Sequence, residues 1–327
     1  MIIGGDKKAV IENMKQAAVD GDFNRKVEVD DPKLTQEQET EYVKNYIDIH
    51  PSIGYRFCNT LARGIADTAT KIINRNTEID GVEKLRMTPG GAIVTSNHFN
   101  PIDNTAVRYT VKKAGCKRLF IVSQATNLAM TGWIGFLMNY TDIIPIMKAK
   151  NYMEKAFPER IANVLDAGHK ILIYPEEEMW FNYRKPRIPK RGAYYFAAKN
   201  NVPVVSLFVE IRDLQERDND QFMKVRYIVH VLDPIMPDPS KSVRQNSIDM
   251  AEIDFRQKIE AYEKAYGRKY SPSFEDGDVA GWIGGEPEER AAGATDEAAV
   301  TGSEKPEAGI GEPLFEMLDP HEKVGAE

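Results

Sequence analysis

The chain has 327 residues, of which 42% are hydrophobic, and it carries a formal net charge of −7. This size and composition exclude a small disulfide-stabilised fold and allow one large α/β domain or two smaller ones. The two cysteines, Cys58 and Cys116, form no CxxC motif. No apolar stretch approaches the roughly 20 residues that a membrane span needs, and the amino-terminal residues have no signal-peptide pattern. We therefore expect a cytoplasmic protein whose contact with the membrane, at its inner face, is peripheral.

Charge divides the chain into two parts. Residues 271–327 contain 15 acidic and 3 basic residues, whereas residues 1–270 contain 35 acidic and 40 basic residues. The acidic segment is rich in Gly, Ala, Glu and Pro, a composition that favours disorder over a packed core. The predicted domains are a helical extension at 1–76, an α/β domain at 77–270 and a disordered acidic tail at 271–327.

Three helices are predicted in the extension. Apolar residues spaced by three or four indicate one helix around Met14, a second around Tyr46 and a third over residues 52–74. The third helix carries an apolar stripe, which either packs on the protein's own core, the interpretation we favour, or rests on a lipid surface. The stripe consists of Ile53, Phe57, Leu61, Ile65, Ala69 and Ile72.

Predicted strands and helices alternate through the middle of the chain, after a turn at 77–90. The expected fold class is therefore α/β, with a single mixed, largely parallel sheet flanked by helices. The apolar segment 126–142 is expected to be a core helix, with an acyl tunnel or an exposed apolar patch as alternatives. Strands are predicted at 92–94, 118–123, 143–148, 170–174, 202–211 and 224–232, and further helices at 104–115, 153–167, 192–200 and 246–266.

The segment 91–104, GAIVTSNHFNPIDN, places a histidine and an aspartate at the end of a short apolar strand. In an α/β sheet, ligands usually bind at the carboxyl ends of the strands. A carboxylate at the start of the next helix can accept a hydrogen bond from one nitrogen of the His98 ring and leave the other as a base. The alternative is structural: His98 closes a strand and Asp103 caps a helix.

Three adjacent carboxylates, at 176–178, follow the strand at 170–174. Either they form a solvated, salt-bridged loop with the cations that come next, or those cations bind anionic substrate groups that a carboxylate helps to orient. The cations are Arg184, Lys185, Arg187, Lys190 and Arg191.

Taken in order, these segments resemble the glycerolipid acyltransferases, the family of bacterial 1-acyl-glycerol-3-phosphate acyltransferases. The residues from His98 to Asp103 match the family's HxxxxD motif, and the resemblance extends over about residues 80–235. The later blocks are IPIMK at 144–148, YPEEEM at 174–179 in place of FPEGTR, KRGA at 190–193 and VPVVS at 202–206. Lys148 stands where the family has an arginine, Met179 replaces the arginine of FPEGTR, and Ser206 replaces the final proline.

The resemblance implies transfer of a fatty-acyl group from a thioester donor, carried on coenzyme A or on acyl carrier protein, to a hydroxyl of a lysophospholipid or glycerol-phosphate acceptor. His98 would be the general base, oriented by Asp103, with a backbone amide of the 97–103 turn stabilising the oxyanion. Glu176 would organise the acceptor pocket. Lys148, Lys190 and Arg191 would bind phosphate, with Arg184, Lys190 or Arg191 replacing the missing arginine.

No metal, bound cofactor or nucleic-acid partner is expected. Two other functions remain open. One is an acyl-thioester hydrolase that uses the same base on water. The other is a non-catalytic lipid- or acyl-binding protein with the same fold, because fold alone does not determine function.

Overall fold

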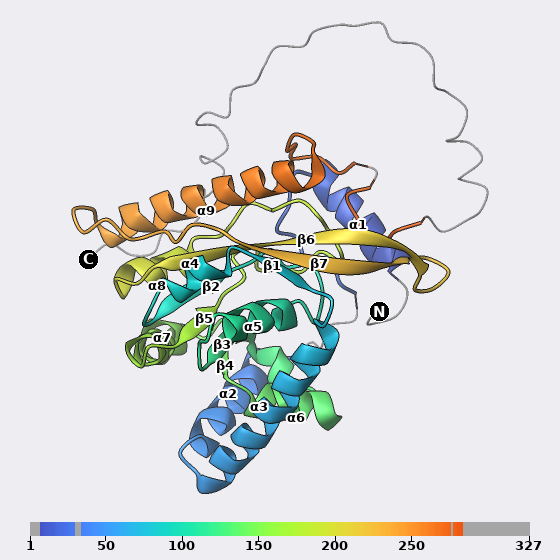
Figure 1. Cartoon of the computed structure of the whole chain (residues 1–327). Coiled ribbons are helices and arrows are strands. Elements are labelled where there is room, and N and C mark those ends of the chain that lie inside the picture. The colour runs from blue at the N-terminus through green and yellow to red at the C-terminus, as the bar shows by residue number, and fades with distance from the viewer. Residues whose placement is uncertain (1–6, 30–33, 276, 284–327) are drawn as a thin grey trace, which may run out of the picture. The chain divides into compact units, whose positions relative to one another are not determined.

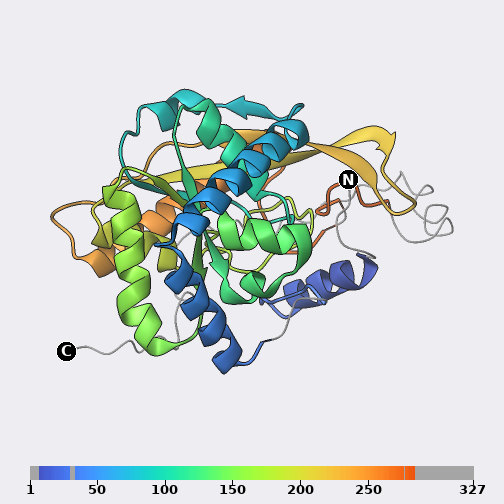
Figure 2. The same ribbon diagram turned by 90° about the horizontal axis from the view of Figure 1, so that it is seen from below.

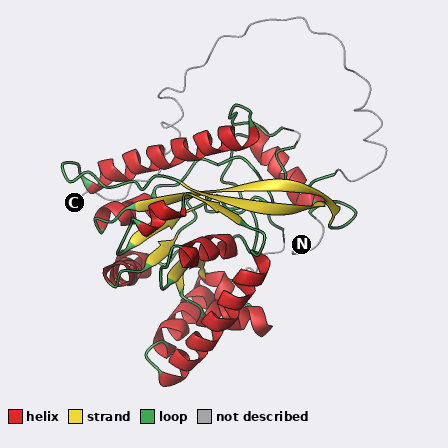
Figure 3. Ribbon diagram, in the orientation of Figure 1, coloured by secondary structure: helices red, strands yellow, loops and turns green. Residues whose placement is uncertain are grey.

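Within residues 7–29, 34–275 and 277–283, which the computed structural model describes, the chain forms a seven-stranded sheet between helices (Figure 1, Figure 3). The strand order is β1-β7-β6-β2-β5-β3-β4. All neighbouring strands are parallel except β6 and β7, so the predicted fold class is confirmed. The strands are β1 (Glu78–Asp80), β2 (Ala92–Thr95), β3 (Leu119–Gln124), β4 (Ile143–Ile146), β5 (Lys170–Leu172), β6 (Val204–Arg217) and β7 (Met223–Val231).

Helices cover the sheet on both sides. The long helix α9 packs on α8 and β6, and α5 lies on the opposite side of the sheet, between it and α3 (Figure 1). The helices are α1 (Lys8–Val19), α2 (Gln36–Ile49), α3 (Ile53–Ile73), α4 (Val82–Arg86), α5 (Asn104–Lys113), α6 (Gly132–Tyr140), α7 (Phe157–Asp166), α8 (Gly192–Lys199) and α9 (Val243–Tyr266). A 3₁₀ turn (Ala125–Ala129) precedes α6, and a π turn (Tyr152–Ala156) leads into α7.

The strands β2 and β5 form the centre of the core. Ile93, Val94, Ile171 and Leu172 are fully buried, as expected for apolar runs in a parallel sheet that is covered on both faces. Val94 pairs with Leu172 in parallel register. The segments that follow the two strands therefore leave the sheet side by side at its carboxyl edge, where both contribute to the candidate site.

The edge strand β1 was not predicted, because its residues lie in a segment that reads as a turn. β1 pairs in parallel with β7, with Ile79 opposite Val229. Its sequence, EID, alternates exposed acidic residues with one isoleucine. Charged residues are common on sheet edges, where they protect the open hydrogen-bonding groups, and so the apolar pattern of a core strand is absent.

The amino-terminal helix α1 belongs to a second, smaller core on the same compact unit as the sheet, Met1–Ile283. Its buried residues Ile11 and Met14 pack with Trp180 and Phe181, which come from the segment after β5. The Trp180 indole nitrogen donates a hydrogen bond to the Arg25 carbonyl oxygen at 3.0 Å. The extension thus supports the loop that carries Glu176.

The predicted start of the disordered tail, Ser271, is wrong. Val279 and Ala280 are buried, and Asp278 is fully enclosed. The Asp278 carboxylate forms an ion pair with Lys185 at 2.9 Å, and the Ala280 amide donates to the Asn182 carbonyl oxygen at 2.9 Å. The short apolar stretch at 279–283 is masked in the composition by the long acidic segment behind it. The remaining tail residues, 284–327, lie outside the described residues.

The favoured interpretation of the apolar stripe on α3 is also wrong, because the stripe faces outward. Ile53 is 85% exposed, Phe57 71% and Ile72 65%. The opposite face of α3 packs inward through Tyr55, which is 8% exposed, and through smaller or polar groups: Ala62 is fully buried, and the Asn59 amide donates to the Tyr140 carbonyl oxygen at 2.8 Å. The packed face of α3 therefore consists of one tyrosine and of small or polar side chains, and not of the apolar stripe.

The predicted core helix at 126–142 is shorter and more exposed than expected. It becomes α6, which runs beside α3 (Figure 2). Trp133 is 71% exposed and Ile134 is 44% exposed. Two packed helices therefore present large apolar side chains to solvent. No helix in the described part of the chain combines the length and the apolar character needed to cross a membrane.

Candidate active site

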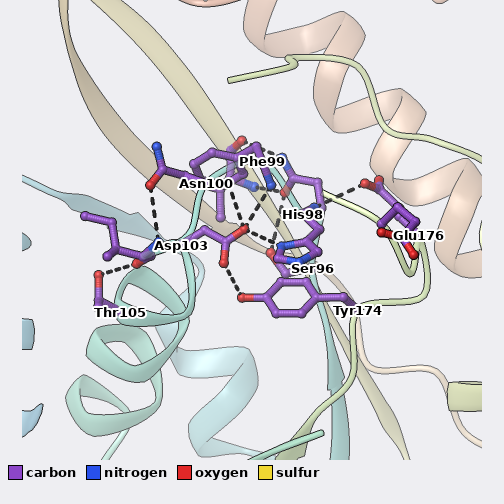
Figure 4. A network of polar contacts seen from close by, with 12 residues as sticks. Ser96, His98, Phe99, Asn100, Asp103, Thr105, Tyr174 and Glu176 are labelled. Carbon is purple, nitrogen blue, oxygen red and sulfur yellow. Dashed lines mark hydrogen bonds and ion pairs between the residues drawn. The ribbon is translucent and has the colours of Figure 1, made fainter. Parts of the chain in front are cut away.

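The loop after β2 brings His98 and Asp103 together (Figure 4). The His98 Nδ1 lies 2.8 Å from the Asp103 Oδ2. Because a carboxylate only accepts, this contact places the proton on Nδ1 and makes Nε2 the basic nitrogen. His98 Nε2 forms no hydrogen bond with another described residue. The His98 side chain is 22% exposed and that of Asp103 is 2% exposed, so a reactant can reach the ring but not the carboxylate.

Asp103 is held as an acceptor rather than as a helix cap. It occupies the position before α5, yet its side chain makes no capping hydrogen bond. Its Oδ2 instead accepts from the amides of Phe99 at 2.9 Å and Asn100 at 3.2 Å, in addition to His98. These backbone donors hold the carboxylate in place independently of the His98 ring. The arrangement therefore fits a carboxylate that orients His98 better than a carboxylate that caps a helix.

Tyr174 is a site residue that the sequence analysis did not identify. Its hydroxyl donates to the Asp103 Oδ1 at 2.6 Å, and its ring stacks on the His98 ring with centroids 4.0 Å apart. Burial, reinforced by the Asp103 charge, raises the pKa of the Tyr174 hydroxyl well above its ordinary value, so it stays a donor. Its place beside Pro175, at the head of the YPEEEM block, was the one available signal.

Glu176 is buried, with 3% of its surface exposed, and its carboxylate is fully engaged. Its Oε2 accepts from the His98 amide at 3.1 Å, and its Oε1 accepts from the Arg187 amide at 2.9 Å. The Arg187 guanidinium completes the ion pair, with Nη2 2.9 Å from Oε2. Glu176 therefore positions the His98 backbone, and its oxygen atoms point into the protein rather than toward a ligand.

Arg187 is the second residue whose role the sequence analysis did not identify. Only 2% of its surface is exposed. Besides Glu176, it donates through Nη1 to the Phe23 carbonyl oxygen at 3.0 Å and lies over the Trp180 ring at 5.0 Å. It thus ties the segment after α1 to the loop beneath His98. The sequence showed five cations in this stretch, and the structure shows that Lys185 and Arg187 are the buried ones and that Arg187 is the one that pairs with Glu176.

The other predicted cations fall into two groups. Lys190 is exposed, and its amide donates to the Pro175 carbonyl oxygen at 2.7 Å, which places it beside the Glu176 loop. Arg191 directly precedes α8, and Lys148 is exposed just after β4. Arg184, in contrast, is turned toward β6, where it pairs with Asp213 at 2.5 Å and lies over the Tyr266 ring. The expectation that Arg184 replaces the missing phosphate-binding arginine is therefore corrected: Arg184 holds β6 instead.

From His98 to Asp103 the backbone amides of the turn are already engaged, so none of these offers a free oxyanion donor. The amide of His98 is bound by Glu176, and those of Phe99 and Asn100 are bound by Asp103. The amides of Ile102 and Asp103 donate to Asn100, and residue 101 is proline. The turn uses its backbone donors to fix its own shape, because two buried carboxylates require them. No group of three or more His, Cys, Asp or Glu side chains in the described residues is arranged to hold a metal ion.

Comparison with known proteins finds a matching family model. Residues 76–210 match the family model described as Acyltransferase. No curated protein sequence matches the chain at a significant level. Among solved structures, the crystal structure of the 1-acyl-sn-glycerophosphate (LPA) acyltransferase, PlsC, from Thermotoga maritima matches with a TM-score of 0.45 and 14% identity, over 72% of this chain and 98% of that chain. Residues 76–210, which match the family model, contain His98, Asp103 and Glu176.

Proposed function

Because residues 76–210 are an acyltransferase-family domain, we propose that the protein transfers a fatty-acyl group from a thioester donor to a hydroxyl of a glycerophosphate- or lysophospholipid-like acceptor. The donor is acyl-CoA or acylated acyl carrier protein. The observation that supports this proposal most strongly is the partly exposed His98 ring, held by Asp103 with its Nε2 unbonded to any described residue. Such an atom is suited to take a proton from an incoming hydroxyl.

The proposed reaction needs one base and no covalent acyl-enzyme. As the acceptor oxygen attacks the thioester carbonyl carbon, its proton passes to the His98 Nε2 and a C–O bond forms. The C–S bond then breaks, and the imidazolium returns the proton to the leaving thiolate. Asp103 stabilises the imidazolium across the 2.8 Å contact, and Tyr174 packs against the ring and keeps it in place.

Recognition of the anionic acceptor is assigned to Lys148, Lys190 and Arg191. Lys190 supports this best, because its amide is bound to Pro175 next to the catalytic loop. A lysine binds phosphate as a point charge on a flexible stem, which tolerates more than one head group. Glu176 acts as a positioning residue in this scheme, through the His98 amide and Arg187.

The decisive experiment measures thiol release from acyl-CoA with and without a lysophospholipid acceptor. We expect release to depend on the acceptor, with an acylated lipid as the product by mass spectrometry, because the base has to remove a proton from a bound hydroxyl. Thiol release at an equal rate without any acceptor, with free fatty acid as the product, would identify a hydrolase. Binding of acyl-CoA with no turnover on any acceptor would identify a non-catalytic protein.

The outward apolar stripe of α3 supports peripheral contact with a membrane. Its residues form one continuous face of a helix, and Trp133 and Ile134 add to it from the neighbouring α6. Apolar side chains on one face of a helix with cations beside them are typical of helices that lie in the lipid interface. Arg56 and Lys71 are such cations on α3. We propose that α3 lies on the lipid surface that supplies the acceptor.

Introducing charge into this stripe is expected to weaken binding to vesicles. Phe57→Glu with Leu61→Glu removes two apolar side chains from the surface, which at about 1.5 kcal/mol or more each lowers vesicle partitioning by at least about tenfold. Co-sedimentation with anionic vesicles measures this. The matched control, Tyr195→Glu with Leu214→Glu, changes two apolar residues of 40% and 37% exposure elsewhere. Equal partitioning of the stripe variant and wild type would contradict the membrane proposal.

A further inference from the structure

A hollow of about 460 Å³ lies at the opposite edge of the sheet from His98. It is formed where β3 and β4 begin, because Arg118 directly precedes β3 and Asp142 directly precedes β4, and the two strands are parallel. His98, in contrast, follows the carboxyl end of β2. The amino-terminal half of α3 covers the hollow on one side, so it is separate from the candidate active site.

Four arginines line this hollow and one carboxylate faces them. The arginines are Arg56 and Arg63 from α3, Arg118 before β3 and Arg160 from α7. Asp142 is buried, with 1% of its side chain exposed, and pairs with Arg118 and with Arg63, whose Nε lies 3.2 Å away. Although burial works in the opposite direction, these ion pairs lower the pKa of Asp142 below its ordinary value. It is therefore charged at neutral pH.

The histidine in the same hollow adds no charge at neutral pH. His50 lies with its Nδ1 2.7 Å from the Tyr46 carbonyl oxygen and its Nε2 2.7 Å from the Arg160 Nη2. A carbonyl oxygen only accepts and a guanidinium only donates, so Nδ1 is the donor and Nε2 the acceptor. The His50 ring is therefore neutral, with its proton on Nδ1. Burial, with a smaller contribution from Arg160, lowers the pKa of His50 to about 4. Four guanidinium groups thus face a single negative charge.

This excess of positive charge is costly unless an anion compensates it. Each guanidinium has five N–H donors, and the contacts of Asp142 and His50 use only some of those on Arg63, Arg118 and Arg160. Arg56 is exposed and has no ion pair with another described residue. Arginine forks match the geometry of phosphate oxygens and bind them with paired hydrogen bonds. The net charge of about +3 on the lining favours a doubly charged anion over a carboxylate.

We propose that this hollow binds a doubly charged phosphate group. Its source is either a free phosphate or the head group of an anionic lipid, and the stripe on α3 favours the lipid. Arg56 directly precedes Phe57 of the stripe, so a helix that rests on a bilayer holds the rim of the hollow at the level of the head groups. A volume of about 460 Å³ admits a small head group, since ligand sites commonly span about 300–1,000 Å³. The inference does not depend on acyl transfer.

Titration calorimetry of the full chain with soluble probes tests the proposal. The probes are inorganic phosphate, dihexanoyl phosphatidic acid and dihexanoyl phosphatidylcholine, of which the last has no phosphomonoester. We expect wild type to bind phosphatidic acid at least about tenfold more tightly than phosphatidylcholine. Arg56→Gln with Arg160→Gln is expected to weaken phosphatidic acid binding by at least about tenfold, because it removes charge-assisted hydrogen bonds.

Two further variants establish whether the binding belongs to this hollow. Lys71→Gln with Arg75→Gln removes two exposed cations from the other end of α3 and just beyond it, and we expect it to bind as wild type does. His98→Ala with Lys190→Ala alters the proposed acyl-transfer site and is also expected to retain binding. If the double arginine variant does not fold, Arg56→Gln alone, at an exposed position, provides the same comparison.

Tighter binding of phosphatidic acid than of inorganic phosphate identifies a lipid head-group site, and equal affinities identify a free-phosphate site; both support the proposal. It is overturned if neither inorganic phosphate nor phosphatidic acid binds wild type, or if phosphatidylcholine binds as tightly as phosphatidic acid. It is also overturned if the arginine variant retains full affinity, if the Lys71/Arg75 variant weakens binding equally, or if the loss of binding follows His98 and Lys190 instead.

Discussion

Replacing His98 with alanine is expected to lower the turnover of acyl transfer by at least about 100-fold, the lower end of what a positioned general base contributes. The protein should remain folded, because the Asp103 Oδ2 still accepts from the Phe99 and Asn100 amides after the ring is gone. The measurement is the rate of acylated lipid formation at saturating donor and acceptor, with circular dichroism to verify the fold.

A second histidine provides the control for this variant. His169 is partly buried and its ring stacks on that of Phe120 with centroids 5.6 Å apart, at the amino end of β5. His169→Ala should leave turnover within a factor of about 2, since a partly exposed side chain far along the sheet from the reacting atoms changes little beyond local packing. Folded His98→Ala protein with near-wild-type turnover would rule out the proposed base.

Replacing Arg187 with methionine is expected to reduce the free energy of unfolding by about 3–5 kcal/mol, which is the cost of leaving one buried charge without its partner. Glu176 remains enclosed after the change and loses the contacts to the guanidinium at 2.9 and 3.1 Å. Urea denaturation followed by tryptophan fluorescence reports this directly, since Trp180 packs against the guanidinium. Turnover should fall as well, because the Glu176 carboxylate also holds the His98 amide.

The double variant Glu176→Gln with Arg187→Met distinguishes loss of the ion pair from loss of packing. Removing the orphaned charge should recover part of the lost stability, because a neutral amide is less costly to bury than a carboxylate. Arg226→Met serves as the surface control: Arg226 pairs with Glu78, but their side chains are 35% and 59% exposed, so a loss of no more than about 1 kcal/mol is expected. A loss for Arg187→Met as small as that of Arg226→Met would show that the buried pair has no special role.

Local patterns predicted much of the framework. The apolar runs around Ile93 and Ile171 indicated buried strands, and both lie at the centre of the sheet. The spacing between His98 and Asp103 predicted their contact, because a turn of four residues at the end of a strand brings the two side chains to the same side. The short, charged β1 escaped prediction, because its pairing with β7 depends on residues about 150 positions away.

The sequence by itself determined the strands other than β1, the order of the motif blocks and the pairing of an imidazole with a carboxylate, because these depend on residues close together along the chain. Only the tertiary structure decided which of many cations are buried. Arg187 reaches Glu176, whereas Arg184 turns away to Asp213. It also decided that the apolar stripe of α3 faces outward and that four arginines from three separate segments surround Asp142. The reason is physical: burial and charge compensation depend on which distant segments pack together, and a helical period specifies a face but not its neighbour.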